Sequence, residues 1–263
     1  MPPEPPANNG RAPAGRAPGG WRLVVTLTAM LLGMAGLVAS AAGIASQELP
    51  RKFTTAQEQQ IIAWETASRW RTMPAGKIFP GSVRYHLAAY SQTVGTQLLL
   101  TADRVGISPE VTCAAGADAA AARVLDAGGC TAILRATYAD ETDSILVTVG
   151  VAVMPGAAAA RSAAARLSDG HPQLSGVRTA AFPATLASTF GDEQRQLSEA
   201  VSKGPYVVLS AVGYADGRPQ VPVSSDPYAD EEMTSIADGI SDAVETLLGS
   251  LPATPRCPGA PGC

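Results

Sequence analysis

The chain has 263 residues and a net charge of -4; 16% of its residues are charged and 5% are aromatic. Proteins that bind nucleic acid usually present a basic face, so this composition argues against a nucleic-acid partner. The length suits one large domain or two small ones, and it is sufficient to bury a core.

An apolar segment near the N-terminus predicts a membrane anchor. Residues 21–44 are mostly apolar, and no charge occurs between Arg22 and Glu48. A helix of about 25 residues crosses a hydrocarbon core of about 30 Å. We therefore expect a transmembrane helix over residues 21–44, preceded by a disordered tail over residues 1–20 that is rich in Pro, Gly and Ala. Arg11 and Arg16 favour a cytoplasmic tail, which makes the remainder extracytoplasmic.

Two alternatives concern the same segment. Ala39-Ser40-Ala41 fits a signal-peptidase site, and cleavage near Ala41 would give a secreted protein. Ala35, Ala39 and Gly43 recur at every fourth position, a spacing that favours a homo-oligomer formed by the transmembrane helix. In an Ala-rich sequence this spacing also arises by chance.

Residues 45–111 are expected to hold a membrane-proximal helix and a linker region. Thr55 and Glu58 have the spacing of a capping box, which predicts a helix over residues 55–72. Further on, Val83, Tyr85 and Leu87 alternate with polar residues, which predicts a short strand. Residues 95–106 fit a helix or a strand equally well.

Residues 112–250 are expected to form the main domain, and residues 251–263 a disordered tail of Pro, Gly and Cys. The patterns predict helices over 118–126, 157–167, 185–201 and 230–248, and strands over 131–140, 144–154, 175–181, 206–214 and 220–223. This order indicates an α+β fold of mainly antiparallel sheet with helices packed on one face. Tyr138-Ala139-Asp140 and Tyr214-Ala215-Asp216 suggest two similar αββα halves.

The four cysteines all follow the apolar segment, and an even count favours disulfides in an oxidising compartment. Cys113 and Cys130 flank one predicted helix, so we expect them to be bonded. Cys257 and Cys263 either pair locally or remain available to a partner. Their spacing does not suit zinc, and we predict no metal and no cofactor.

No reaction is indicated by the sequence, and we assign no catalytic residue. The chain lacks a nucleophile elbow and a phosphate-binding loop. His171 has no nucleophile beside it in sequence. His86 could serve Ser91 or a distant serine, but a surface or packed histidine is the favoured interpretation. Four acidic residues lack the pattern of a calcium loop and suit the N-terminus of a helix: Asp226, Asp230, Glu231 and Glu232.

The turn at residues 213–219 is the predicted recognition site. It combines Tyr214, Asp216 and Arg218, and Tyr and Arg are enriched at binding hot spots. Turn chemistry alone also explains Asp216 and Gly217.

The layout of a Pro-rich tail, a single apolar segment and an α+β domain resembles single-pass envelope proteins of high-GC Gram-positive bacteria. The anchor, the cysteines and the missing catalytic set predict a binding or scaffold domain at the cell envelope, with an envelope protein as partner. The alternatives are an extracytoplasmic hydrolase with a non-standard site and a sensor of a small ligand. A pocket that holds a histidine, a serine and a carboxylate would favour the hydrolase.

Overall fold

The computed structural model describes residues 53–87, 98–168, 175–221 and 227–250, together with four residues of the N-terminal segment: Val24, Leu27, Thr28 and Met30. The chain divides into two units, Met1–Thr54 and Thr55–Cys263. In the first unit Val24, Leu27, Thr28 and Met30 are helical. Among the described residues, no helix has both the length and the apolar composition needed to cross a membrane. The predicted anchor at residues 21–44 otherwise lies outside the described part.

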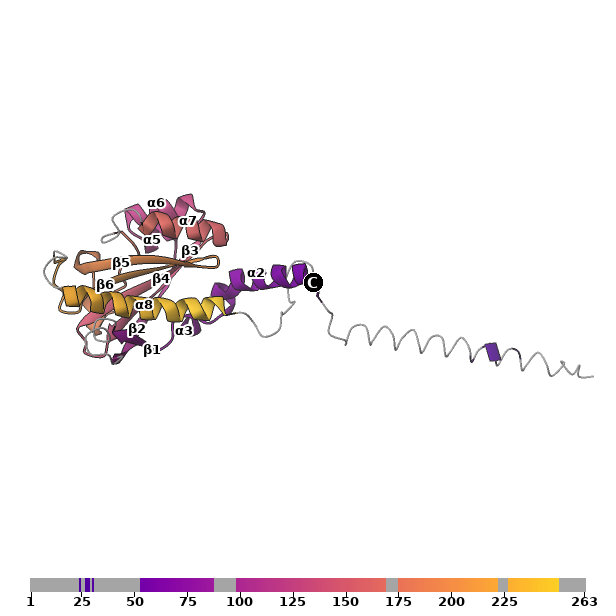
Figure 1. Ribbon diagram of the computed structural model, residues 1–263, viewed down its shortest axis with the longest axis horizontal. Coiled ribbons are helices and arrows are strands. Elements are labelled where there is room, and N and C mark those ends of the chain that lie inside the picture. Colours follow the sequence, from indigo (N-terminus) through magenta and orange to yellow (C-terminus); the bar gives the residue numbers. More distant parts are fainter. Residues whose placement is uncertain are drawn as a thin grey trace, which may run out of the picture. The chain divides into compact units, whose positions relative to one another are not determined.

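The second unit is built on a six-stranded sheet in which every neighbouring pair is antiparallel (Figure 1). Its order is β1-β2-β3-β4-β6-β5, so β1 and β5 form the two edges. The strands are β1 Ser82–Leu87, β2 Leu98–Val111, β3 Ala132–Asp140, β4 Ile145–Val153, β5 Arg195–Lys203 and β6 Tyr206–Tyr214. The predicted α+β class with a mainly antiparallel sheet is confirmed. The strands β1 and β2, in the segment expected to be a linker region, belong to this same sheet.

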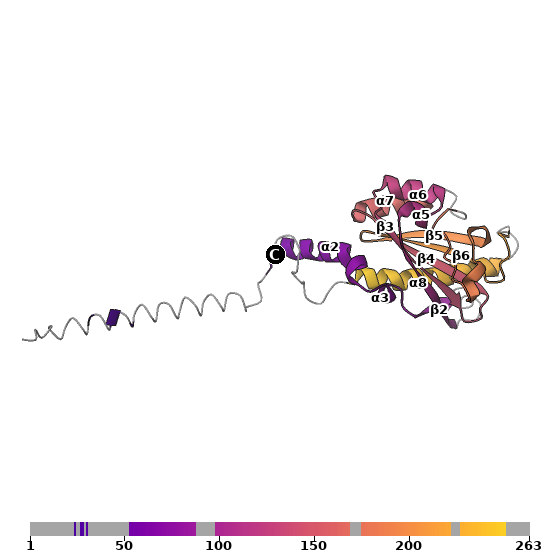
Figure 2. The same ribbon diagram turned by 180° about the vertical axis from the view of Figure 1, so that it is seen from behind.

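Helices cover both faces of the sheet, so the prediction of one covered face is wrong (Figures 1 and 2). One core contains residues of α5 (Cys113–Gly116), α6 (Ala119–Ala127) and α7 (Ala157–Ser168). The other contains residues of α2 (Thr55–Thr72), α3 (Ala75–Ile78) and α8 (Pro227–Gly249). The reason is visible in β4, which is buried at all nine positions. A strand that is apolar on both sides needs cover on both sides.

The core beneath α8 is formed by one row of a strand and one stripe of a helix. One row of β4 lies in it, at alternating positions from Ile145 to Val153. The apolar stripe of α8 meets this row with Met233, Ile236, Ile240 and Val244. The two facing surfaces therefore follow the period of two of a strand and the period of about 3.6 of a helix.

Helix α2 is fastened to the end of α8. The guanidinium of Arg69 donates hydrogen bonds to the carbonyls of Leu247 and Leu248 at 3.1 and 3.0 Å. These carbonyls belong to the last turn of α8, where a cation is favourable. Trp70 is buried in the same core. The predicted helix at 55–72 is confirmed, with Trp70 in core packing.

The predicted helix over 185–201 is wrong. Two short 3-10 turns, Leu186–Thr189 and Asp192–Gln194, lead into strand β5 instead. Local propensity favours a helix here, but pairing with β6 overrides it. A tight turn at Gly204, with φ +54°, joins β5 to β6 and fixes their register.

The strands predicted over 175–181 and 220–223 are not formed as expected, so the chain does not contain the second αββα half. In the described part of 175–181, pairing is limited to an isolated bridge between Ala117 and Val177. Gln220 and Val221 lie outside any strand. The two Tyr-Ala-Asp motifs also differ in place: Asp140 ends the first strand of its hairpin, whereas Tyr214 ends the second strand of the other. The first half has the predicted order, and the second does not.

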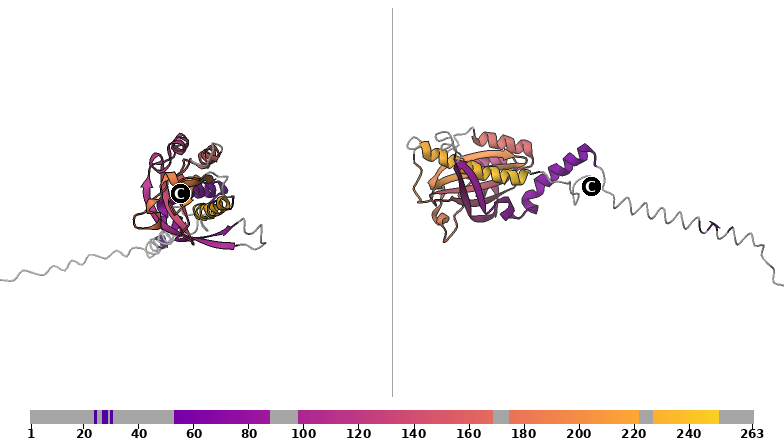
Figure 3. Two further views of the ribbon diagram at one scale, coloured as in Figure 1. Left: turned by 90° about the vertical axis from the view of Figure 1, so that its left-hand side faces the viewer. Right: turned by 60° about the horizontal axis from the view of Figure 1, so that its bottom comes forward.

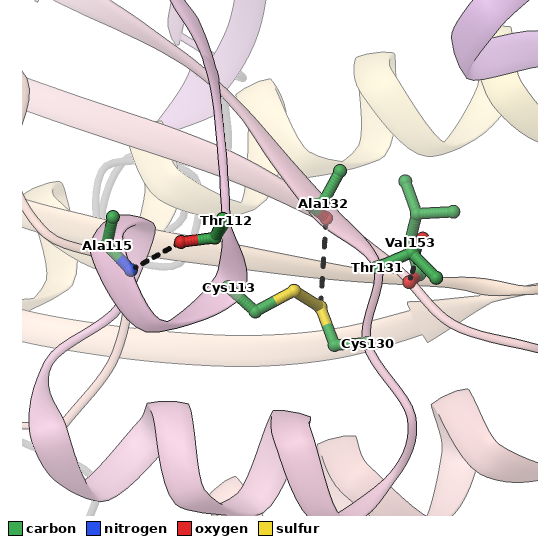
Figure 4. The surroundings of a disulfide bond; sticks show 7 residues. All are labelled: Thr112, Cys113, Ala115, Cys130, Thr131, Ala132 and Val153. Carbon is green, nitrogen blue, oxygen red and sulfur yellow. Dashed lines mark hydrogen bonds between the residues drawn. A yellow bond between two sulfur atoms is a disulfide. The ribbon is translucent and has the colours of Figure 1, made fainter.

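The predicted disulfide between Cys113 and Cys130 is confirmed (Figure 4). Their Cα atoms are 6.2 Å apart, and the bond closes a loop with a sequence separation of 17. Thr112 caps α5 by accepting a hydrogen bond from the amide of Ala115 (Figure 4). The bond thus joins the start of α5 to the entry of β3 across α6.

Candidate functional site: a groove between an edge strand and a helix

The two edges of the sheet differ in how their backbone groups are covered. At β5, the hydroxyl of Ser168 donates to the carbonyl of Ala200 at 3.2 Å. The amide of Val221 donates to the side chain of Gln196 at 2.7 Å, which brings a loop against the same edge. For β1, no covering hydrogen bond of this kind is found among the described residues. The edge at β1 is therefore the more open one.

The direction of the β1 backbone groups follows from one hydrogen bond. The amide of Arg104 donates to the carbonyl of Gly81 at 2.9 Å, and the register continues with Ser82 opposite Asp103. Opposed residues of an antiparallel ladder alternate between pairs that exchange hydrogen bonds and pairs that do not. The bonded pairs of β1 are therefore at 83, 85 and 87. The amides and carbonyls of residues 82, 84 and 86 point toward the free edge.

Two adjoining hollows lie along this edge, with volumes of about 520 and 490 Å³. Arg84 and His86 of β1 and Ala243 of α8 line both of them. We call the combined feature the β1–α8 groove; its further lining includes Ser235, Asp238 and Asp242 from α8 and Ser82 and Leu99 from the sheet. Helix α8 lies close to β1 (Figure 3). The groove thus has a strand edge on one side and a helix flank on the other.

A glycine allows the close approach of the two walls. A Cβ atom on Gly239 of α8 would lie 2.3 Å from the Cβ atom of Tyr85. Such a separation is far below a carbon–carbon contact of about 3.5–4.0 Å. Tyr85 is 2% exposed, so it has little room to move. Gly239 therefore determines the distance between α8 and the edge strand.

The two faces of β1 present different chemistry. Val83 and Tyr85 are buried in the core that contains α8. Arg84 and His86 are exposed and lie on the other face, because side chains alternate along a strand. His86 is paired in register with Leu99 of β2, which is 47% exposed. The outer face at this edge therefore carries Arg84, His86 and the partly exposed Leu99, with Asp103 opposite Ser82 at one end.

The helix wall of the groove is acidic. From Asp230 to Gly249, α8 contains six acidic residues and no Lys, Arg or His. Burial and the charge of Asp242 raise the pKa of Asp238. On β5, at the opposite edge of the sheet but also in contact with α8, burial and the charge of Asp238 raise the pKa of Glu199 to about 7. Burial is the larger cause of both shifts, and repulsion between the neighbouring carboxylates adds to it.

A second charged cluster, outside the groove, fastens the fold. Arg195 is 2% exposed at its side chain and contacts Asp118 and Asp192, each at 2.9 Å. Burial acts to raise the pKa of Asp118, but hydrogen bonds from the amides of Ala121 and Gly176 and from Arg195 lower it overall. Asp118 also caps α6. We interpret this cluster as structural because its groups are used to join α6, the 176–179 segment and β5.

The predicted recognition turn forms its own internal contacts. Asp216 accepts hydrogen bonds from Arg218, and the Arg218 guanidinium lies 4.3 Å from the centre of the Tyr214 ring. The side chains of Asp216 and Arg218 remain about half exposed, at 51% and 53%. The turn begins in the last two residues of β6 and contributes no residue to the groove. The structure brings Tyr214, Asp216 and Arg218 together, but at a different place from the groove.

The other candidate residues are placed as follows. His86 lies in the groove, where its imidazole has no hydrogen-bond or ion-pair partner among the described residues. Asp230, Glu231 and Glu232 belong to α8, which begins at Pro227. Within the described part, no group of three His, Cys, Asp or Glu residues is arranged for a metal. His171, Asp226, Cys257 and Cys263 lie outside the described residues.

Comparisons of this chain with protein-family models, with curated proteins and with solved structures found no match. The function is therefore argued from the site alone.

The groove itself was not identified from the sequence. The alternation at residues 82–87 and the missing basic residues in α8 were both visible signals. The proximity of the two segments could not be predicted, because about 150 residues separate them and no local pattern indicates which edge of the sheet stays open.

Proposed function

We propose that this protein is a binding domain that takes up an extended polypeptide segment at the β1–α8 groove. The carrying observation is the open edge of β1, where the backbone groups of residues 82, 84 and 86 point outward beside a helix flank. Extended peptides bind such edges by adding a strand, and adjacent pockets supply specificity. A membrane anchor at residues 21–44 and an extracytoplasmic location at the cell envelope belong to the same proposal, and an envelope protein is the partner.

The experiment uses proline to remove single outward amides. Arg84→Pro and His86→Pro each delete one amide at the free edge, where proline is tolerated better than inside a ladder. Ser202→Pro is the matched control on the opposite edge. The carbonyl of Ala200 points away from the ladder to Ser168, so the amide of residue 202 shares that outward direction.

Binding is read by site-specific photocrosslinking in membranes that contain the full-length protein. A photoreactive residue at position 86 should crosslink to one extended segment of a partner, and Arg84→Pro should abolish this product. The same residue at Val201, on β5, is the positional control. Equal crosslinking from both positions, or a product that survives both groove prolines, would refute strand addition at β1.

The recognition turn remains a rival surface for the same function. Replacing Tyr214 and Arg218 by Ala tests it in the same crosslinking assay. We expect the product from position 86 to persist in this variant, because the turn does not line the groove. Its loss, with thermal unfolding unchanged, would move the binding surface to the turn.

A hydrolase is the second candidate, since His86, Ser235 and Asp238 all line one hollow. These are the residue types of nucleophilic catalysis. Ser235 is 7% exposed, and His86 forms no ion pair with Asp238 or Asp242 among the described residues. A fluorophosphonate probe tests this candidate: labelling at Ser235 that disappears in Ser235→Ala and His86→Ala would establish it.

A further inference from the structure

The acidic wall of the groove defines the chemistry of the segment that it accepts. We propose that the bound segment carries Lys or Arg at every second position, directed at Asp238 and Asp242 of α8. This inference rests on the proposed strand addition to β1.

The alternation follows from the geometry of an added strand. Its side chains point in turn to the two faces of the sheet. One row extends the face of Val83 and Tyr85 and therefore meets the flank of α8. The other row extends the outer face beside the Arg84 guanidinium, which repels a further cation. A uniformly basic segment therefore fits less well than an alternating one.

Asp238 and Asp242 form no ion pair among the described residues. Asp238 and Asp242 are at positions i and i+4 of α8, where like charges destabilise a helix. Both are exposed on the flank. The pKa of Glu245 is raised overall. Burial and the charge of Asp242 act to raise it, and the charge of Lys203 acts to lower it. A bound cation next to Asp238 and Asp242 relieves this repulsion.

A second copy of the same chain fits this wall poorly. If β1 of another copy were added, its row facing α8 would consist of Val83 and Tyr85, which carry no charge and are already buried. Its outer row would place Arg84 and His86 beside the same two residues of the first copy. The occupant with matching charge is therefore a basic segment of another protein.

The test measures fluorescence anisotropy of labelled peptides with the full-length protein. The probes alternate Lys with Ser or Glu with Ser and are about ten residues long, the upper end of common strand lengths. We expect the Lys–Ser probe to bind more tightly than the Glu–Ser probe. Asp238→Asn combined with Asp242→Asn should weaken the Lys–Ser probe by about tenfold, since each exposed pair contributes modestly. The acidic control Glu231→Gln, which does not line the groove, should leave the affinity unchanged.

The outcomes separate the inference from the proposed function. If Arg84→Pro, or His86→Pro where the first variant does not fold, weakens no probe, strand addition itself fails. If a groove proline weakens the probes but the Glu–Ser probe binds as tightly as the Lys–Ser probe, the basic partner is wrong and strand addition stands. If Asp238→Asn combined with Asp242→Asn leaves the affinity for the Lys–Ser probe unchanged, the basic partner is likewise wrong and strand addition stands. If both the groove proline and the double Asp→Asn variant weaken binding of the Lys–Ser probe, strand addition and the basic partner are both supported.

Discussion

Substitution of Gly239 by Ala tests whether α8 and β1 are as close as the groove requires. The new Cβ atom would lie 2.3 Å from the Cβ atom of Tyr85, so either α8 or β1 must move by about 1.2 Å or more to restore a normal contact. Overpacking of this kind costs about 1–3 kcal/mol, and the clash involves two atoms with no flexible end, which places it near the upper limit. Replacing Gly by Ala inside a helix returns about 1 kcal/mol. We expect a net loss of about 2 kcal/mol in the free energy of unfolding.

Gly156→Ala is the matched control for this substitution. Gly156 precedes α7, and a Cβ atom there has no neighbour within 4 Å. Neither glycine has a positive φ, so the two variants differ in steric contact and not in backbone strain. Urea unfolding should show Gly156→Ala as neutral or slightly stabilised and Gly239→Ala as clearly destabilised. Equal stability of both variants and the wild type would refute the close approach and the groove dimensions that depend on it.

Three further predictions follow from the described contacts. Replacing Cys113 and Cys130 by Ala should lower the free energy of unfolding by about 3 kcal/mol, because the loop is no longer closed in the unfolded chain; a urea midpoint equal to that of the wild type would contradict this. In β1, hydrogen exchange should alternate, with fast amides at 82, 84 and 86 and slow ones at 83, 85 and 87, and uniform protection would show that the edge is covered. The pKa of Glu199 is raised to about 7, so its charged form destabilises the fold, and stability should fall as the pH rises from about 4.5 to about 7. Glu199→Gln should flatten this pH dependence in thermal unfolding, whereas an unchanged slope would assign it to other groups.

The sequence predicts the central elements of the fold because their patterns are strong and local. Strands β3, β4 and β6 are apolar runs bounded by turn residues, and α8 has an uninterrupted helical stripe. The failures lie where tertiary pairing decides the structure. Residues 195–203 contain good helix formers, yet they form an edge strand because β6 offers a ladder and α7 covers one side.

The two cysteines were paired correctly because they flank one helix, which keeps their separation short. The groove needs a different kind of information. Its walls come mainly from residues 82–86 and 235–247. Their contact depends on Gly239, whose role becomes clear only when Tyr85 is known to lie against it. Sequence reasoning instead selected Tyr214 and Arg218 by residue type. The structure shows that these two side chains already contact each other.

The contrast between the two edges supports binding at β1. An uncovered edge strand exposes the protein to unwanted pairing, and natural sheets usually protect such edges. This fold protects β5 with Ser168 and with the loop that reaches Gln196, so the means of covering an edge are present. At β1 the corresponding place holds a groove with a row of carboxylates that repel one another along α8. The open edge leaves backbone groups available for pairing, and repulsion between Asp238 and Asp242 reduces stability. The addition of an alternating basic strand would satisfy the first and relieve the second. Because one binding event would address both features, we interpret the open edge as a binding site and not as a defect of packing.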